Sequence, residues 1–133
     1  MDRTEELKSS DSRILAEEAV KLLLEKKAID VKMFEVTEHT SITDYYVNAT
    51  GRSSLHVASL ADDLCESFSQ RGRPAYRTEG KRGNSWILVD FGSLIVNVFD
   101  SESRSFYNFD RLLPAECCVD IEELVNEVDK KFS

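Results

Sequence analysis

The chain has 133 residues, of which 41% are apolar and 32% charged, and its formal net charge is −8 at pH 7. This profile is typical of one compact globular domain, and it argues against both a disordered chain and a pair of domains. No apolar run approaches the roughly 20 residues that a membrane helix requires, so we expect no membrane contact. The acidic N-terminus resembles neither a secretory signal nor a transit peptide, which favours the cytoplasm.

The histidine and cysteine content argues against a metal site. Cys65, Cys117 and Cys118 form no C-x-x-C pair, and an odd number of cysteines is typical of reduced thiols in a cytosolic protein. Zinc requires four ligands at suitable spacings, and only two histidines, His39 and His56, are available. We therefore predict no bound metal, and we interpret His56 as a surface or cap residue.

The acidic net charge argues against binding through RNA phosphates, which normally requires a basic patch. Cations exceed anions locally in residues 71–82, where Glu79 is accompanied by Arg71, Arg73, Arg77, Lys81 and Arg82. Two interpretations of this stretch stay open, a solvated loop edge and a limited phosphate contact. An acidic body is better suited to a basic protein partner than to nucleic acid.

The first half of the chain predicts two helices separated by two strands. Apolar residues recur at three- and four-residue steps from Ser12 to about Lys27, which is typical of an amphipathic helix. Residues 31–37 and 43–50 have the composition of strands. A second apolar stripe predicts a helix that Ser53 or Ser54 caps and that Gly72 ends.

The second half predicts three strands and a third helix. Residues 75–79 form a short strand, and the apolar runs Trp86–Val89 and Leu94–Phe99 form a hairpin. A capping box beginning at Asp120 introduces a helical pattern that continues to Phe132. The order α-β-β-α-β-β-β-α predicts an α/β domain, in which a mixed sheet is flanked by helices.

The hairpin register decides which side chains share a face of the sheet. We take Phe91-Gly92 as a two-residue turn, which pairs Asp90 with Ser93 and Trp86 with Asn97. One face is then wholly apolar and belongs under the helices. The opposite face, termed the mixed face, combines aromatic and polar residues suited to a partner: Trp86, Leu88, Asp90, Ser93, Ile95, Asn97 and Phe99.

Two motifs resemble the Iojap-like ribosomal silencing factor family. The first is the Trp-led hairpin with its Asp-aromatic-Gly turn, followed by Arg104-Ser-Phe-Tyr-Asn-Phe-Asp-Arg-Leu112. The second is Ser41-Ile-Thr-Asp-Tyr-Tyr-Val-Asn-Ala-Thr-Gly51, followed by Ser53-Ser54. We therefore divide the chain into a flexible acidic leader (1–10), a domain similar to that family (11–113) and a C-terminal helical extension (114–133).

The resemblance implies a topology like that of the nucleotidyltransferases and a role in repressing translation. Similar proteins bind the large ribosomal subunit through large-subunit ribosomal protein fourteen and sterically block joining of the small subunit. That mechanism implies no catalysis and no cofactor, and members tend to form homodimers. The sequence departs from the usual motif where Ser93 replaces Asp, Asn97 replaces His and Leu113 replaces Trp.

Aromatic and arginine side chains are concentrated in the first motif, and these residue types dominate protein interfaces. We expect Trp86 and Tyr107 at an interface and Phe106 in the core. Asp44 is interpreted either as a strand-start residue or as a functional carboxylate. The predicted structural residues are Asp44, Gly51, Ser53 and Gly92, and the predicted partner-binding residues are Trp86, Leu88, Asp90, Ser93, Asn97, Arg104, Tyr107 and Arg111.

The alternative is a metal-dependent nucleotidyltransferase or a degenerate nucleotide-binding domain. Such enzymes need a Gly-Ser turn for phosphates and, on the next strand, two carboxylates one residue apart for Mg²⁺. The Gly51-Arg-Ser53 turn could imitate the first element, but the following strand carries only Glu79. Asp62 and Asp63 diverge by about 100° on a helix. We therefore predict a binding protein with no catalytic residue.

Overall fold

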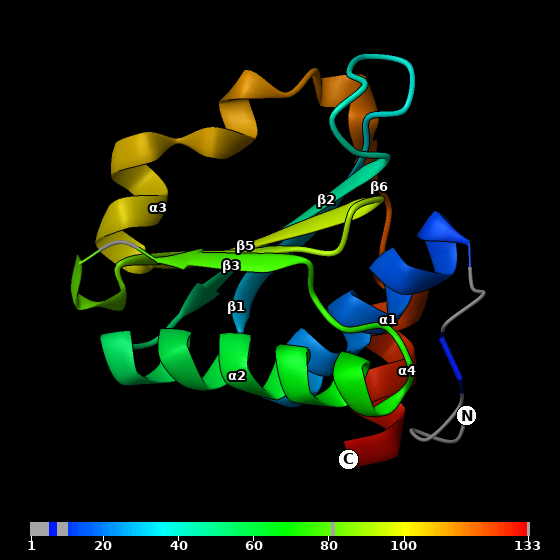
Figure 1. Cartoon of the computed structure of the whole chain (residues 1–133). Helices are drawn as coiled ribbons and strands as arrows, with labels where there is room; N and C mark the ends of the chain where they lie inside the picture. The colour runs from blue at the N-terminus through cyan, green and yellow to red at the C-terminus, as the bar shows by residue number, and fades with distance from the viewer. Residues whose placement is uncertain (1–5, 8–10, 81, 133) are drawn as a thin grey trace.

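A computed structural model describes residues 6–7, 11–80 and 82–132, the last range without the side chains of residues 82 and 132. Six strands form one sheet in the order β3-β4-β5-β2-β1-β6 (Figure 1). Strands β2 and β5 are parallel, and all other neighbouring pairs are antiparallel. The strands are β1 (Ile29–Glu35), β2 (Tyr45–Gly51), β3 (Arg77–Gly80), β4 (Trp86–Asp90), β5 (Leu94–Asp100) and β6 (Cys118–Val119).

Helices α1 (Ser12–Glu25) and α2 (Ser54–Gln70) cover one face of the sheet, as the sequence pattern predicts (Figure 1). Both helices begin at a side-chain cap, because Asp11 accepts a hydrogen bond from the Ile14 N–H and Ser53 from the His56 N–H. Between the helices and the sheet lies a core of Leu, Val, Ala and Phe side chains. The predicted mixed sheet flanked by helices is confirmed.

The hairpin of β4 and β5 turns one residue later than predicted. Asp90 pairs with Ile95, and the Phe91 N–H donates to the Leu94 carbonyl at 2.8 Å, so the turn residues are Gly92 and Ser93. The predicted Phe91-Gly92 turn is therefore wrong, and every cross-strand pair moves by two residues. Because side chains alternate with a period of two, the predicted division between apolar and mixed faces survives this shift.

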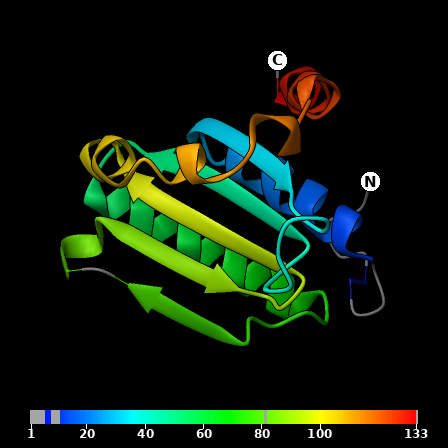
Figure 2. The ribbon, with the colours of Figure 1, turned by 90° about the horizontal axis from the view of Figure 1, so that it is seen from above.

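The structure contains two elements that the predicted order lacks, the helix α3 and the strand β6. A third helix, α3 (Ser101–Tyr107), follows β5 directly, because Asp100 caps it by accepting from the Ser103 N–H at 2.7 Å. The chain then passes through the 3₁₀ turns Phe109–Leu112 and Ala115–Cys117 to the short strand β6. We call residues 101–117 the crossing segment, because it runs over the mixed face from the end of β5 to the far edge of the sheet (Figure 2).

The two ends of the chain contact the domain. Leu7 lies within the predicted leader, but its side chain is buried and its N–H donates to the Arg71 carbonyl at 2.7 Å. Residues 1–5 and 8–10 of that leader lie outside the described residues. In the predicted extension, β6 pairs with β1, and α4 (Glu122–Phe132) packs beside α1 with Val128 buried.

Candidate partner-binding face

The crossing segment covers only part of the mixed face. Its residues Leu113 and Cys117 pack against Phe34 and Val36 of the β1 region. In the described part of the chain it does not lie over β3, and it contacts β4 at Trp86 (Figure 2). On the uncovered part, Leu88 is half-buried, and the Arg77 and Glu79 side chains of the edge strand are exposed. A hollow of about 210 Å³ lies between β3 and β4, lined by Glu79, Gly80, Trp86 and Leu88. This part of the sheet can accept a partner.

An aromatic cluster joins the uncovered part to the crossing segment. The Trp86 ring lies 4.9 Å from the Phe99 ring and 4.7 Å from the Tyr107 ring, measured between centroids. The Phe109 ring lies 6.3 Å from Trp86 and 5.2 Å from Tyr46. Trp86 is half-buried in this cluster, so it supports the crossing segment besides presenting an edge to solvent.

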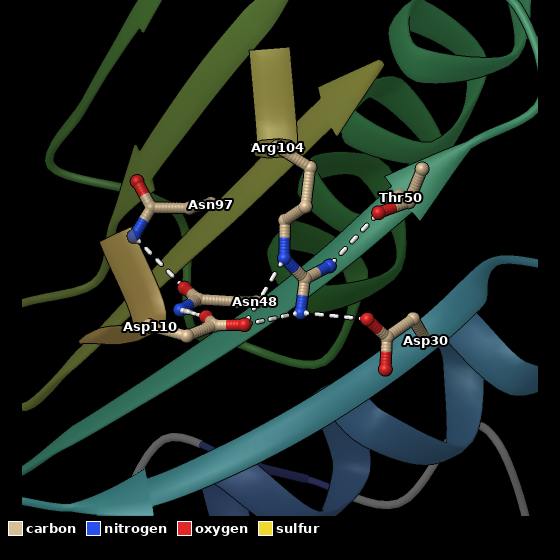
Figure 3. Close-up of polar contacts among 6 residues, drawn as sticks. All are labelled: Asp30, Asn48, Thr50, Asn97, Arg104 and Asp110. Carbon is tan, nitrogen blue, oxygen red and sulfur yellow. Dashed lines mark hydrogen bonds and ion pairs between the residues drawn. The ribbon is translucent and has the colours of Figure 1, made fainter. Parts of the chain in front are cut away.

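A chain of hydrogen bonds, which we call the polar relay, lies beneath the crossing segment, and Figure 3 shows its part from Asn97 to Asp110. The Trp86 indole N–H donates to Asn97 Oδ1 at 3.0 Å, and Asn97 Nδ2 donates to Asn48 Oδ1 at 3.0 Å. Asn48 Nδ2 then donates to Asp110 Oδ1 at 2.6 Å. Because Asn48 and Asn97 are fully buried, these bonds satisfy polar groups that water cannot reach.

Arg104 completes the relay from α3. Its Nε and Nη2 donate to Asp110 Oδ2 at 3.2 and 2.9 Å, and its Nη1 donates to Thr50 Oγ1 at 2.9 Å. Asp30 lies 3.6 Å from Nη2 as a second carboxylate (Figure 3). Asp30 has a left-handed backbone at a bulge in β1, with φ of 50°, which turns it out of the regular strand pairing.

Several apolar side chains of the crossing segment are exposed to solvent. Phe106 is 79% exposed, Leu112 75% and Tyr107 41%, and Arg111 beside them is also exposed. The prediction that Phe106 belongs to the core is wrong, because α3 is a single short helix with only Ser103 and Arg104 buried. We call Phe106, Tyr107, Arg111 and Leu112 the exposed rim.

The structure separates the predicted partner-binding residues into buried and accessible groups. Asn97 is fully buried and Arg104 is 9% exposed, so both lie inside the protein and hold the crossing segment rather than facing a partner. Both residues are polar because they belong to one internal hydrogen-bond network. The sequence alone could not distinguish such buried polar residues from polar residues on the surface. The side chains that remain accessible are Trp86, Leu88, Asp90, Ser93, Tyr107 and Arg111.

Asp90 and Ser93 stabilise the hairpin turn. Asp90 Oδ1 accepts from the Gly92 N–H at 2.7 Å, and its Oδ2 accepts from Arg77 Nε at 3.1 Å. The Ser93 hydroxyl accepts from Arg73 Nη2 at 3.5 Å. Across the mixed face, burial and the Asp90 charge together raise the pKa of Tyr46, so this phenol stays neutral at physiological pH.

The predicted structural residues occupy turns and close approaches. A Cβ on Gly51 would lie 2.7 Å from Val57 Cγ2, and Gly92 has a left-handed φ of 90°. Asp44 stands immediately before β2, where its N–H donates to the Ser93 carbonyl and its carbonyl accepts from the Val36 N–H. This backbone pairing accounts for Asp44 as a strand-start residue.

Two of the five cations in residues 71–82 form ion pairs within the protein. Arg71 is 5% exposed and paired with Glu18 at 2.9 Å, and Arg77 is paired with Glu79 and Asp90. Lys81 and the Arg82 side chain lie outside the described part. Arg71 and Arg77 are thus committed to carboxylates, which disfavours phosphate contact at this loop.

His56 is a cap residue, as predicted. Its Nδ1 accepts from the Arg52 N–H at 2.9 Å, so its Nε2 carries the proton and donates to the Lys26 carbonyl, also at 2.9 Å. The ring therefore ties the start of α2 to the end of α1. Among the described side chains no group of three His, Cys, Asp or Glu is arranged to hold a metal, and no described helix is long and apolar enough to span a membrane.

Sequence reasoning missed Asn48, Thr50, Asp110 and Asp30 as partners of Arg104 and Asn97. The available signal was the isolated Asn48 in a strand of otherwise aromatic, β-branched and small residues, within a motif already singled out. A buried amide of this kind requires partners. Those partners lie on other strands and on the crossing segment, which no local pattern identifies.

Comparison with known proteins assigns the chain to a family. The family model described as "Ribosomal silencing factor during starvation" matches residues 9–133. The ribosomal silencing factor of Haemophilus influenzae is 35% identical over 86 residues, which are 65% of this chain and 84% of that protein. The Zymomonas mobilis factor is 32% identical over 104 residues, 78% of each chain.

A mitochondrial protein and two solved structures extend this comparison. The mouse protein named for mitochondrial assembly of the ribosomal large subunit is 30% identical over 96 residues, covering 70% of this chain and 42% of its own. A crystal structure from Chromobacterium violaceum superposes with a TM-score of 0.74 at 25% identity, covering 77% of this chain and 85% of that one. One from Bacillus halodurans has a TM-score of 0.70 at 27% identity, covering 83% and 99%.

The fold is a mixed α/β domain, and the matching family model and relatives are named for ribosomal silencing or ribosome assembly and not for a reaction. The chain belongs to the family of Iojap-like ribosomal silencing factors.

Proposed function

We propose that this protein binds the large ribosomal subunit in the cytoplasm and sterically prevents the small subunit from joining. The uncovered part of the mixed face and the exposed rim form the contact surface, and large-subunit ribosomal protein fourteen is the partner. The mechanism is occupancy of a face, without catalysis or cofactor. Homodimer formation stays a prediction from the family resemblance, which sedimentation velocity of the pure protein tests.

The observation that carries this proposal is the accessible apolar rim next to an uncovered sheet. Phe106 and Leu112 expose most of their surface. The Phe106 ring packs on Tyr107, which in turn packs on the half-buried Trp86 of the sheet. Clustered exposed aromatic and aliphatic residues with an arginine are typical of interface centres. The net charge of −8 favours a basic protein as the partner over ribosomal RNA.

Leu112→Ala tests this surface, with Leu55→Ala as its matched control. Both leucines are strongly exposed, at 75% and 80%, but Leu55 lies on α2, which covers the opposite face. We expect Leu112→Ala to weaken binding to purified large subunits roughly fivefold or more, since it removes a contact side chain. Leu55→Ala should bind as the parent does.

Co-sedimentation with large subunits measures both variants, and a subunit-joining assay tests the steric mechanism. Equal loss of binding in both variants, or none in either, would contradict the proposed surface. Failure of the parent protein to co-sediment at all would refute the proposed function itself.

A further inference from the structure

We infer that the polar relay positions the exposed rim for its partner, and that Asn48 and Asp110 are positioning residues for partner binding. The inference rests on the proposed function and deepens it. Neither residue touches the partner: Asn48 is fully buried, and the Asp110 side chain is 19% exposed and turned toward Arg104 (Figure 3). Their effect passes through the crossing segment.

The part of the crossing segment that carries the rim needs these polar contacts, because the apolar anchors Leu113 and Cys117 lie beyond it in the chain. Helix α3 has seven residues, too few to be stable alone, and the 3₁₀ turn at residues 109–112 buries none of its residues. Apolar support comes from Phe109 and Tyr107 against Trp86. The remaining anchors are Arg104 and Asp110, one on each side of the left-handed Asn108.

Inward and outward side chains alternate closely along this stretch. Arg104, Phe109 and Asp110 face the sheet, whereas Phe106, Arg111 and Leu112 face solvent. Tyr107 does both, because it packs on Trp86 and stays partly exposed. The ion pair between Arg104 and Asp110 fixes the angle at which the helix meets the following turn. A change in that angle would move Phe106 relative to Leu112, so the anchors set the spacing of the rim.

The relay has only one possible direction. At one end, the Trp86 indole can only donate, and at the other end, the ionised Asp110 can only accept. Each intervening amide must therefore turn its oxygen toward Trp86 and its nitrogen toward Asp110. A fully satisfied buried network of this kind specifies one arrangement, because any alternative leaves a buried polar group unpaired. The relay thus selects a single placement of Asp110 on the sheet.

The isosteric change Asn48→Asp breaks the relay at its centre. It replaces the donor 2.6 Å from Asp110 by a second carboxylate, so Asp110 is repelled from the sheet. Trp86 is the only tryptophan of the chain, and it both ends the relay and packs on Tyr107. Its fluorescence therefore reports the docking of the crossing segment independently of binding.

We expect Asn48→Asp to red-shift the Trp86 emission and to weaken large-subunit binding roughly tenfold, at a temperature where circular dichroism shows the domain folded. The double variant Asn48→Asp with Asp110→Asn exchanges the two groups, so that position 48 carries the accepting carboxylate and position 110 the donating amide. It should restore the emission and part of the affinity, because an amide oxygen at position 110 can still accept from Arg104, although the ion pair is lost. Leu112→Ala serves as a contact control, which should weaken binding without moving the emission.

The outcomes are distinguishable. Two results would contradict the positioning role and leave the proposed function standing. In the first, Asn48→Asp shifts the emission but binds large subunits as the parent does. In the second, the double variant regains the emission without the affinity. If the parent does not bind, the positioning role and the proposed function both fall. Should Asn48→Asp fail to fold, Asp110→Asn alone is a milder change, in which the new amide nitrogen meets a donor of Asn48 or Arg104. The same two measurements apply. Loss of affinity together with the emission shift supports the inference, and unchanged affinity overturns it.

Discussion

Asn97 makes hydrogen bonds in the buried network that a histidine could also make. The family motif commonly has His at this position, and Asn here both accepts from Trp86 and donates to Asn48. A neutral imidazole likewise offers one donor and one acceptor. The departure from the motif is therefore compatible with the same relay, whereas an apolar residue at position 97 would leave the buried Asn48 oxygen unpaired.

Gly51 is required by a close approach between β2 and α2. A Cβ there would lie 2.7 Å from Val57 Cγ2 and 2.9 Å from the Val57 backbone nitrogen, so backbone must move to admit it. We expect Gly51→Ala to lower the free energy of unfolding by about 1–3 kcal/mol, the usual cost of overpacking, and Gly51→Val to lower it more.

Urea unfolding measures this effect, and Gly80→Ala is the matched control. A Cβ on Gly80 meets only Ile87 Cγ1, at an ordinary 3.8 Å, and the residue lies in the exposed edge strand β3. Its substitution should change stability by no more than about 0.5 kcal/mol. A Gly51→Ala protein as stable as the Gly80→Ala protein would show that the turn tolerates a side chain.

At the scale of elements, ion pairs connect three helices on the covered side of the domain. Lys21 of α1 lies 3.1 Å from Glu18 and 2.9 Å from Glu127 of α4, and Glu18 also pairs with Arg71 at the end of α2. Burial lowers the pKa of Lys21, but its bonds to Glu127 and Glu18 outweigh that effect and raise it. The same hydrogen bond between Lys21 and Glu127 lowers the pKa of Glu127.

The directions of these shifts predict a pH window for the docking of α4. Because the folded pKa of Glu127 lies below its ordinary value of 4.5, its contribution is complete above that value and is lost as the pH falls through the folded pKa. We expect Glu127→Gln to be less stable than the parent at pH 7, and the difference to shrink once the pH falls below 4.5 and through the lowered folded pKa.

Denaturant unfolding of both proteins from pH 3 to pH 8 measures this difference. Asp129→Asn is the control, since it lies on the same helix and the structure describes no ion pair for it. Its stability should track that of the parent at every pH. A gap between Glu127→Gln and the parent that stays constant down to pH 3 would exclude the Lys21 pair as the source of the effect.

At the scale of the whole molecule, the charge of −8 predicts how binding depends on salt. With a basic protein partner, rising ionic strength should slow association and weaken the affinity modestly, because long-range attraction is screened. Binding through RNA phosphates would instead release counterions and give a steep log–log slope. Large-subunit binding measured between about 50 and 200 mM salt separates the two cases. A slope of log affinity against log salt of roughly −5 or steeper, which corresponds to six or more phosphate contacts, would contradict a protein partner.

The sequence alone determined the features that depend on local periodicity. Helices α1 and α2 follow from apolar residues at helical spacing, and the start of α2 follows from its cap at Ser53. The division of the β4–β5 hairpin into an apolar and a mixed face follows from strict alternation, and it survived a two-residue error in register. The family motifs are also contiguous stretches of chain.

Only the tertiary structure decided which residues of the mixed face are accessible. Asn97 and Arg104 carry the polar groups expected of an interface, yet the crossing segment covers Asn97 and turns its own Arg104 inward, so both are paired internally. The decisive bonds join residues 49 and 62 positions apart, between Asn97 and Asn48 and between Asn48 and Asp110. Periodicity reaches only a few residues along the chain, so burial produced by a distant segment leaves no local pattern in the sequence.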